Sequence, residues 1–131
     1  MLHSILYVSV TNKDYSKNEL DKLLVQFRTN NKVYNITGIL LYYNRNIIQY
    51  IEGEPEKIYI LFNNIVKDDR HYHVIKLNSE NIDCRKFPEW DMGYKKIDNI
   101  VLVKFIKECL NIKNCNIKEF FDAFLLVNNI C

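Results

Sequence analysis

Apolar and polar residues alternate along the chain with two different periods, and these periods predict an order of strands and helices. Runs with a period of two, or rich in β-branched and aromatic residues, predict strands over 4–10, 36–43, 46–52, 71–77 and 89–94. Apolar positions at helical spacing predict helices over 17–30 and 55–67. The two runs on either side of Asn44-Arg45 are close enough to form a hairpin.

The predicted helices carry start signals and buried stripes. Ser16 followed by Glu19 forms a capping box, and Pro55 suits the first turn of the second helix. The stripe of the first helix is Leu20, Leu23, Leu24 and Phe27. The stripe of the second is Ile58, Leu61, Phe62, Ile65 and Val66.

The predicted order β-α-β-β-α-β-β matches the ferredoxin-like split βαβ arrangement. We therefore expect an α+β sandwich with two helices on one face of a five-stranded mixed sheet. Residues 97–131 predict two further apolar helices, so the chain divides into a domain over 1–96 and a helical hairpin extension over 97–131. An apolar hairpin of this kind is expected to cover the free face of the sheet or to contact another subunit.

Composition narrows the class of partner. Among 131 residues, 18 Lys and Arg against 16 Asp and Glu give a net charge of +2, which offers no electrostatic argument for nucleic acid or an acidic membrane. No apolar stretch reaches about 18 residues, so no transmembrane helix is expected. The N-terminus has no basic segment or cleavage site typical of secretion. Free thiols in a reducing cytoplasm are expected for Cys84, Cys109, Cys115 and Cys131.

Familiar catalytic motifs are missing from the sequence. There is no Gly-rich phosphate loop, no H-E-x-x-H and no nucleophile elbow. His71 and His73 form an H-x-H pair, which on a regular strand places both rings on one face. Because no third or fourth ligand is evident, we expect a packed or surface pair rather than a metal site.

The informative positions are polar residues in apolar surroundings. Gln49 interrupts an otherwise apolar strand, and Tyr7 lies in the middle of the first strand. The first and third strands of the ferredoxin-like layout are neighbours, so these two side chains are expected to be cross-strand or diagonal neighbours on the helix-facing side. Asn30 and Asn31 are expected to close the first helix. Two readings remain: a core Tyr–Gln hydrogen bond with a helix C-cap asparagine, or the wall of a ligand site.

Six short segments in this order resemble the BLUF family of blue-light sensors using FAD. The resemblance covers residues 3 to about 95. The segments are Tyr7-Val8-Ser9, Asn30-Asn31, Ile36-Thr37-Gly38, Gln49-Tyr50-Ile51-Glu52-Gly53, Asp68-Asp69-Arg70-His71 and Trp90-Asp91-Met92-Gly93-Tyr94. The apolar tail is similar to that of the short, stand-alone members of the family.

The resemblance implies a role for each matched position. A flavin ring lies between the two helices of the sandwich in this family. The photoactive tyrosine falls on Tyr7 and the switching glutamine on Gln49, and a tryptophan and a methionine that relay the signal fall on Trp90 and Met92. The implied flavin-binding positions are Asn30, Asn31, Asn64, Asp68, Arg70 and His71. Family members often have arginine where this chain has Asn64, and often glycine where it has Asn35, a residue that tolerates positive φ.

The implied function is that of a photoreceptor without enzymatic activity. Its cofactor is expected to be noncovalent FAD, with FMN or riboflavin as alternatives. Light would move an electron and a proton from Tyr7, rearrange the hydrogen bonds of Gln49 and give a red-shifted signalling state. The expected partners are a protein effector and further copies of the chain, without nucleic acid, membrane or metal.

Two other functions share the predicted layout. An RNA-binding module of RRM type needs exposed aromatic residues within a characteristic basic and aromatic motif, which the chain lacks. A small enzyme of acylphosphatase type needs a loop of backbone amides with an arginine after the first strand. That loop, Thr11-Asn12-Lys13-Asp14, contains neither glycine nor arginine.

Overall fold

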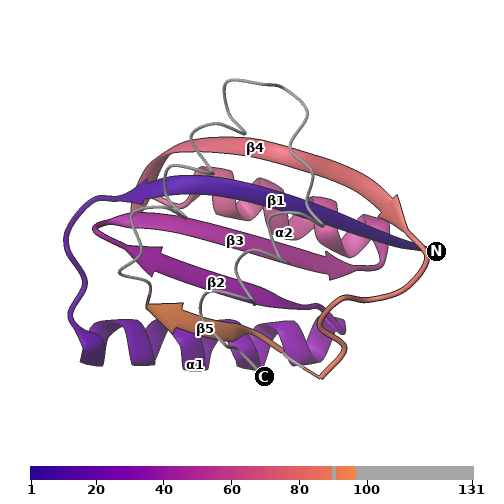
Figure 1. The fold of residues 1–131 in the computed structure, drawn as a ribbon, viewed down its shortest axis with the longest axis horizontal. Helices are drawn as coiled ribbons and strands as arrows, with labels where there is room; N and C mark the ends of the chain where they lie inside the picture. Colours follow the sequence, from indigo (N-terminus) through magenta and orange to yellow (C-terminus); the bar gives the residue numbers. More distant parts are fainter. Residues whose placement is uncertain (90, 97–131) are drawn as a thin grey trace. The chain divides into compact units, whose positions relative to one another are not determined.

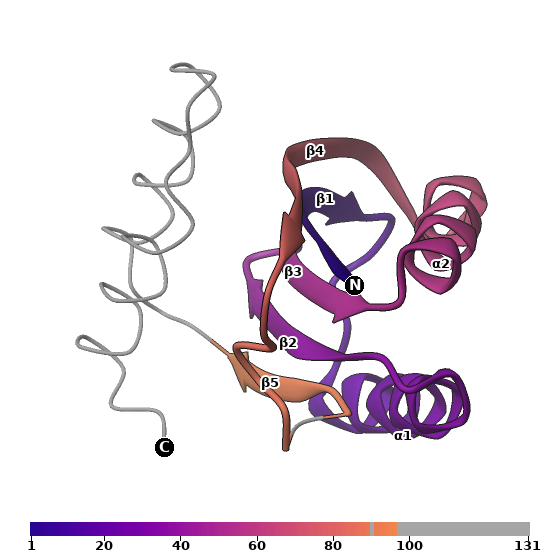
Figure 2. The ribbon, with the colours of Figure 1, turned by 90° about the vertical axis from the view of Figure 1, so that its right-hand side faces the viewer.

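The computed structural model describes residues 1–89 and 91–96, and in this part of the chain two helices lie on one face of a sheet (Figure 1, Figure 2). The α+β prediction is confirmed. The strands are β1 (Leu2–Thr11), β2 (Thr37–Tyr43), β3 (Asn46–Gly53), β4 (His71–Ile82) and β5 (Gly93–Lys96), and the helices are α1 (Lys17–Tyr34) and α2 (Pro55–Lys67). The helices predicted over 97–131, and Trp90, lie outside the described residues.

The sheet has the order β4-β1-β3-β2-β5. The first four strands pair antiparallel, with β1 and β3 adjacent at the centre, as the split βαβ arrangement predicts. The short β5 pairs parallel with β2. It begins at Gly93, later than the predicted strand over 89–94. The backbone carbonyls of Asp91 and Met92 accept hydrogen bonds from side chains of α1, and these two residues do not pair within the sheet.

Helix α1 begins as predicted and ends later. The capping box is present: Ser16 accepts from the Glu19 backbone N–H, and the Glu19 side chain accepts from the Ser16 backbone N–H. The helix continues to Tyr34 and stops at Asn35, whose φ of 54° lies in the left-handed region. The expectation that Asn30 and Asn31 close the helix was therefore wrong. Both lie inside the helix, where successive side chains point about 100° apart.

Strand β4 is irregular where it passes β1. The register shifts opposite Val8 and Val10, and His73 has a φ of 53°. The regular alternation that would place His71 and His73 on one face is interrupted here. His73 is exposed with its ring against Tyr72, whereas His71 is half-buried. The two histidines thus have different surroundings.

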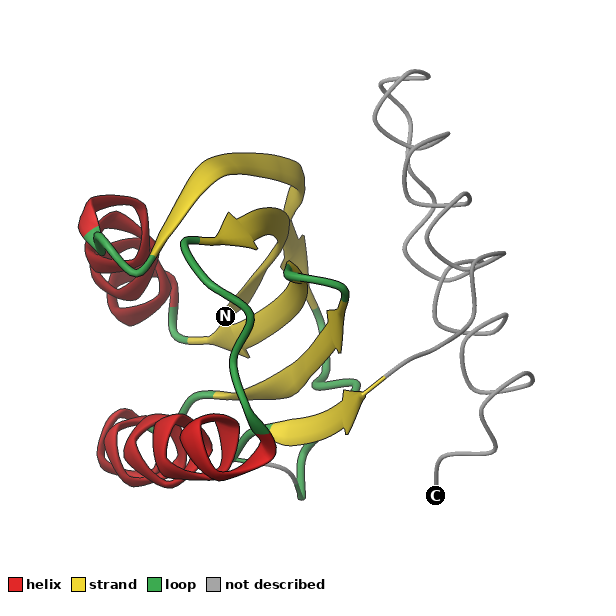
Figure 3. Ribbon diagram, turned by 90° about the vertical axis from the view of Figure 1, so that its left-hand side faces the viewer, coloured by secondary structure: helices red, strands yellow, loops and turns green. Residues whose placement is uncertain are grey.

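The two helices lie on the same side of the sheet (Figure 3), and the core between helices and sheet is built from residues of α1, α2, β1, β2 and β3 with Ile36 and Met92 beside them. Its buried members are Ile5, Leu20, Leu24, Ile36, Leu40, Tyr42, Ile51, Ile58 and Met92. Leu61, Phe62 and Ile65 pack against this cluster, but Val66, predicted to be buried, is 52% exposed. No helix in the described part of the chain is both long and apolar enough to span a membrane.

Gly38 is required by a close approach between β2 and β3. A Cβ added at this position would lie 1.9 Å from the backbone carbonyl oxygen of Tyr50. At Gly53 the nearest contacts of an added Cβ are 3.3 Å away, which a small shift can relieve. The sheet therefore tolerates no side chain at Gly38.

We expect Gly38→Ala to lower the free energy of unfolding by at least about 2 kcal/mol, because the backbone of β3 must move away from β2. Gly53→Ala is the matched control and should cost clearly less. Urea denaturation of both variants measures the difference. Equal losses would contradict the assigned close approach.

Candidate functional site

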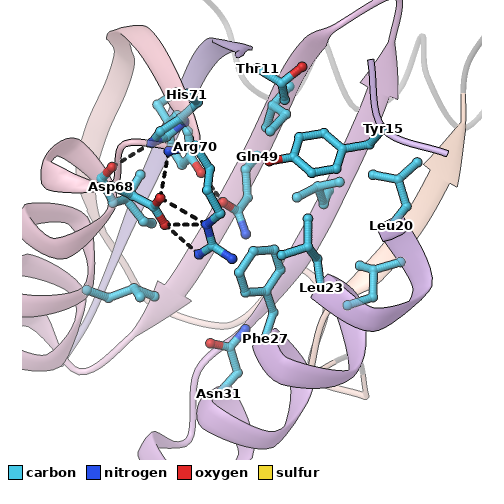
Figure 4. A pocket seen from close by; sticks show the side chains of 16 residues that line it. Thr11, Tyr15, Leu20, Leu23, Phe27, Asn31, Gln49, Asp68, Arg70 and His71 are labelled. Carbon is cyan, nitrogen blue, oxygen red and sulfur yellow. Dashed lines mark hydrogen bonds and ion pairs between the residues drawn. The ribbon is translucent and has the colours of Figure 1, made fainter. Parts of the chain in front are cut away.

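A cavity opens between α1 and α2 on the helix-facing side of the sheet, with about 760 Å³ of space not filled by protein atoms, part of it open to solvent (Figure 4). Most of its wall is apolar and comes from the stripes of the two helices, including Leu23, Phe27, Leu61 and Ile65. The polar or ionisable part of the wall includes Tyr7, Thr11, Asn31, Gln49, Asp68, Arg70 and His71. An apolar wall with a few directed polar groups is typical of a small-molecule site.

A chain of hydrogen bonds links Tyr7, Gln49 and Met92. Tyr7 on β1 and Gln49 on β3 are directly paired in the sheet, and the Tyr7 hydroxyl donates to Gln49 Oε1. On its other side Gln49 Nε2 donates to Met92 Sδ at 3.5 Å. All three side chains are buried, so the amide has one phenol and one thioether as partners. The predicted cross-strand pairing is confirmed.

The Tyr7 phenol is held in its neutral form. Burial raises its pKa well above the usual value near 10, and the negative charge of Asp68 raises that pKa further. Its ring packs edge-on against Phe62 at 5.7 Å and against His71 at 6.5 Å between ring centroids. Tyr7 is thus a fixed, protonated donor in the cavity wall.

Asp68 and Arg70 form an ion pair at the mouth of the cavity. Arg70 Nε lies 2.9 and 3.0 Å from the two carboxylate oxygens of Asp68, and the Arg70 backbone N–H also donates to this carboxylate. The pair lowers the pKa of Asp68 and raises that of Arg70, chiefly through the hydrogen bond between the side chains. The guanidinium reaches across to α1, 5.9 Å from the Phe27 ring centroid (Figure 4). Its charge is largely balanced before any ligand binds.

His71 connects three elements and has both ring nitrogens occupied. Nε2 lies 2.5 Å from the carbonyl oxygen of Ile65 on α2, and Nδ1 lies 2.8 Å from the Ser9 hydroxyl on β1. The carbonyl can only accept, so Nε2 carries the proton and Nδ1 accepts from Ser9. His71 therefore meets the cavity with its ring rather than with a free nitrogen.

Asn31 and Asn30 are neighbours on α1, but they lie on different faces of the helix. Asn31 is buried, lines the cavity and donates from Nδ2 to the backbone carbonyl of Asp91 at 2.7 Å. Its amide oxygen and second N–H remain for a ligand. Asn30 is exposed and does not line the cavity.

The structure thus brings six of the predicted site residues to one cavity and leaves others out. Asn64 is exposed on α2 and, like Asn30, lies away from the cavity wall. Sequence reasoning missed Thr11 and Tyr15, which also line it. Their place at the end of β1 and in the loop leading into the first helix was the available signal. Within residues 1–89 and 91–96, no group of three or more His, Cys, Asp or Glu could hold a metal ion.

The lining of the cavity suits a ring with apolar faces and a polar edge. Aliphatic and aromatic side chains of both helices would cover the faces of such a ring. The amides of Asn31 and Gln49 offer both donors and acceptors, so they suit an edge that carries carbonyl and N–H groups together. The site therefore favours a neutral heteroaromatic ring over an anion or a metal ion.

Comparison with known proteins gives one consistent family. The model of the family described as "BLUF: Sensors of blue-light using FAD" matches residues 2–93. The chain is 24% identical over 134 residues to the blue light- and temperature-regulated antirepressor BluF of Escherichia coli K12, covering 96% of this chain and 33% of that protein. It is 38% identical over 80 residues to photoactivated adenylate cyclase subunit alpha of Euglena gracilis, covering 61% of this chain and 8% of that protein. The chain thus spans a third or less of these relatives.

Solved structures show the same likeness. BlsA in its photo-activated state superimposes with a TM-score of 0.77 at 29% identity, covering 95% of each chain. The dark state of BlrB, a BLUF protein, gives a TM-score of 0.69 at 32% identity and 72% of each chain. Klebsiella pneumoniae BlrP1, in a structure with FMN and cyclic diGMP, gives 0.73 at 28% identity, covering 96% of this chain and 35% of its own.

The raised pKa of Tyr7 predicts a loss of stability in alkali. A phenol that keeps its proton longer in the folded state stabilises that state less as pH rises above about 10, where the unfolded chain has already ionised. The free energy of unfolding should therefore fall above this pH, and Tyr7→Phe should reduce the slope. Urea denaturation between about pH 8 and about pH 11 measures it. Equal slopes in wild type and variant would contradict the assigned burial of the phenol.

Proposed function

The chain belongs to the BLUF family, sensors of blue light using FAD, and we propose that it is a blue-light photoreceptor that binds a flavin noncovalently between α1 and α2. The observation that carries this proposal is the buried chain from the Tyr7 hydroxyl through the Gln49 amide to Met92, at the wall of the cavity. In this proposal the protein signals through a change in the hydrogen bonds of Gln49 and catalyses no reaction.

The residues of the cavity fit a flavin. Asn31 has an amide oxygen and one N–H left for the polar edge of the ring, while Arg70 and Asp68 stand at the mouth with their charges balanced. Phe27 and Ile65 supply apolar contacts from the two helices. His71 would hold α2 and β1 in place through its two occupied nitrogens. Asn30 and Asn64 contribute little to binding in this arrangement, because both are exposed outside the cavity.

Tyr7 and Gln49 form the photoactive pair in this proposal. A bound flavin supplies the absorption of blue light and the capacity to accept an electron from a neighbouring phenol. Tyr7 meets the requirement for such a donor, because it is neutral and carries its proton toward Gln49 Oε1. Loss of an electron would make the phenol strongly acidic, and its proton would then move along this hydrogen bond toward Gln49 Oε1.

Rearrangement of the Gln49 amide would act directly on Met92. In the structure Nε2 faces the thioether, which can only accept. If the amide turned over, Oε1 would face Met92 Sδ, and two acceptors would meet. The attraction would be lost, and the segment that carries Met92 would be released. Trp90, the second residue implied in the relay, lies outside the described residues.

The downstream partner of the light signal is proposed from the relatives. One of them is an antirepressor and another a photoactivated adenylate cyclase subunit, so BLUF domains serve different effectors. We propose that this chain acts on a protein effector in the cytoplasm and forms homo-oligomers through the apolar helices predicted over 97–131. The RRM-like and acylphosphatase-like alternatives are not favoured, because the BLUF family model matches residues 2–93.

Reconstitution tests the flavin site. Protein refolded with excess FAD and then desalted should be yellow, with one flavin per chain, and parallel samples with FMN and riboflavin identify the preferred form. Asn31→Ala should weaken binding by about tenfold through loss of hydrogen bonds to the ring. Asn30→Ala is the matched control and should bind as the wild type does. Protein that stays colourless with every flavin would contradict the proposal.

Substitution of the photoactive pair tests the mechanism. Wild-type protein should show a small, reversible red shift of flavin absorption under blue light. Gln49→Leu removes both the donor and the acceptor of the amide, and Tyr7→Phe removes the hydroxyl. Both variants should bind flavin and fail to form the red-shifted state in absorption spectra. A full reversible shift in Gln49→Leu would refute the mechanism even if flavin binding were confirmed.

A further inference from the structure

The connection between β4 and β5 is fixed to the sheet at its beginning by a buried carboxylate. Glu52, fully buried on β3, accepts hydrogen bonds from the backbone N–H groups of Lys86 at 2.8 Å and Phe87 at 2.9 Å. It also accepts from the Thr37 hydroxyl at 2.8 Å. A buried carboxylate with three donors is a strong anchor, because losing any donor leaves part of its charge unsatisfied.

Arg85 strengthens the same anchor. Its guanidinium donates to Thr37 Oγ1 at 2.9 Å and to the backbone carbonyls of Asn35 at 2.7 Å and Glu52 at 3.2 Å. The start of the connection is thereby tied to the end of α1 and to strands β2 and β3. These contacts lie outside the cavity wall.

The end of the connection is fixed to α1 instead. Arg28 Nε donates to the backbone carbonyl of Met92 at 2.9 Å, and Asn31 Nδ2 donates to that of Asp91 at 2.7 Å. The thioether of Met92 then lies 3.5 Å from Gln49 Nε2. An N–H···S contact is weak, so it does not hold the segment in place by itself. The backbone bonds from α1 supply that constraint.

We propose that Arg28 and Glu52 are positioning residues of the light switch: they fix the two ends of the β4–β5 connection so that Met92 meets the Gln49 amide. This inference rests on the proposed photoreceptor function. Neither residue lines the cavity, so neither is needed to hold the flavin. Arg28 sets the position of Met92 directly, and Glu52 sets where the connection to it begins.

Dark recovery tests Arg28. When light releases the Met92 thioether from Gln49, the bond from Arg28 to the Met92 carbonyl keeps this residue near the amide in flavin-loaded wild type. Arg28→Ala lacks this bond, so Met92 moves further away and must return before the dark state re-forms. Recovery should be slower by about fivefold, the equivalent of one lost hydrogen bond, with flavin affinity unchanged. Arg28→Lys should recover at an intermediate rate. Thr29→Ala is the matched control: Thr29, on the same helix, also donates to a backbone carbonyl, that of Val25 at 2.8 Å, and neither residue lines the cavity.

Two results would overturn the role of Arg28. Recovery of Arg28→Ala within about twofold of wild type would show that the bond to Met92 does not position the switch. Faster recovery would show that Arg28 opposes the return of the dark state. A wild-type protein with no red shift at all would instead refute the proposed photoreceptor function. The proteolysis of Glu52 variants described next does not depend on a red shift.

Proteolysis in the dark tests Glu52. Trypsin cleaves the peptide bonds after Arg85 and Lys86, and the N–H groups of these two bonds, those of Lys86 and Phe87, donate to the Glu52 carboxylate. Glu52→Gln places an NH₂ group where a carboxylate oxygen accepted a backbone N–H, so cleavage at these sites should be at least about fivefold faster. Thr37→Val, which removes one donor to Glu52 and one acceptor of Arg85 and leaves both backbone N–H bonds to the carboxylate, is a milder variant if Glu52→Gln does not fold. Mass spectrometry identifies the sites, and the flavin-loaded variant should also recover more slowly than wild type after illumination. Unchanged cleavage after both residues in folded protein would overturn the anchor, and unchanged dark recovery would overturn its role in the switch.

Discussion

The direct pairing of Tyr7 with Gln49 across the two central strands is the constraint on which the site depends. It requires β1 and β3 to be neighbours in one register, since a slip by one residue would turn one side chain to the opposite face. Both groups are buried and neutral, so the sheet contains no desolvated, unpaired charge at this position. The amide still has a second side, and Met92 occupies it. The helices complete the cavity around this pair, whereas the pairing itself is set by the register of the sheet.

Local signals in the sequence predicted most of the fold. The capping box of α1, the proline at the start of α2 and the alternation of β1 depend on neighbouring residues, and each agrees with the structure. The pairing of Tyr7 with Gln49 also followed, because strand order in a split βαβ layout leaves few choices. The resemblance to BLUF proteins then gave these positions a chemical meaning that periodicity alone does not supply.

Contacts between distant segments were beyond such reasoning. Asn31 lies four residues after Phe27 on the buried stripe of α1, so it reaches the cavity only because the helix continues past the expected end to Tyr34. The bulge at His73 separates two histidines that a regular strand would align. Arg28 and Glu52 look like ordinary surface and strand-end charges in the sequence. Their roles depend on backbone groups about 35 to 65 residues away, which no local pattern reveals.

The anchors of the β4–β5 connection have a consequence for evolution and design. Arg28 and Asn31 donate to backbone carbonyls, and Glu52 accepts from backbone N–H groups. Every amino acid except proline offers both of these backbone groups. The side chains between the anchors, such as Pro88 and Glu89, are therefore free to diverge while the path of the chain is retained. The same freedom makes the segment a natural place to graft a new recognition sequence onto an existing light sensor.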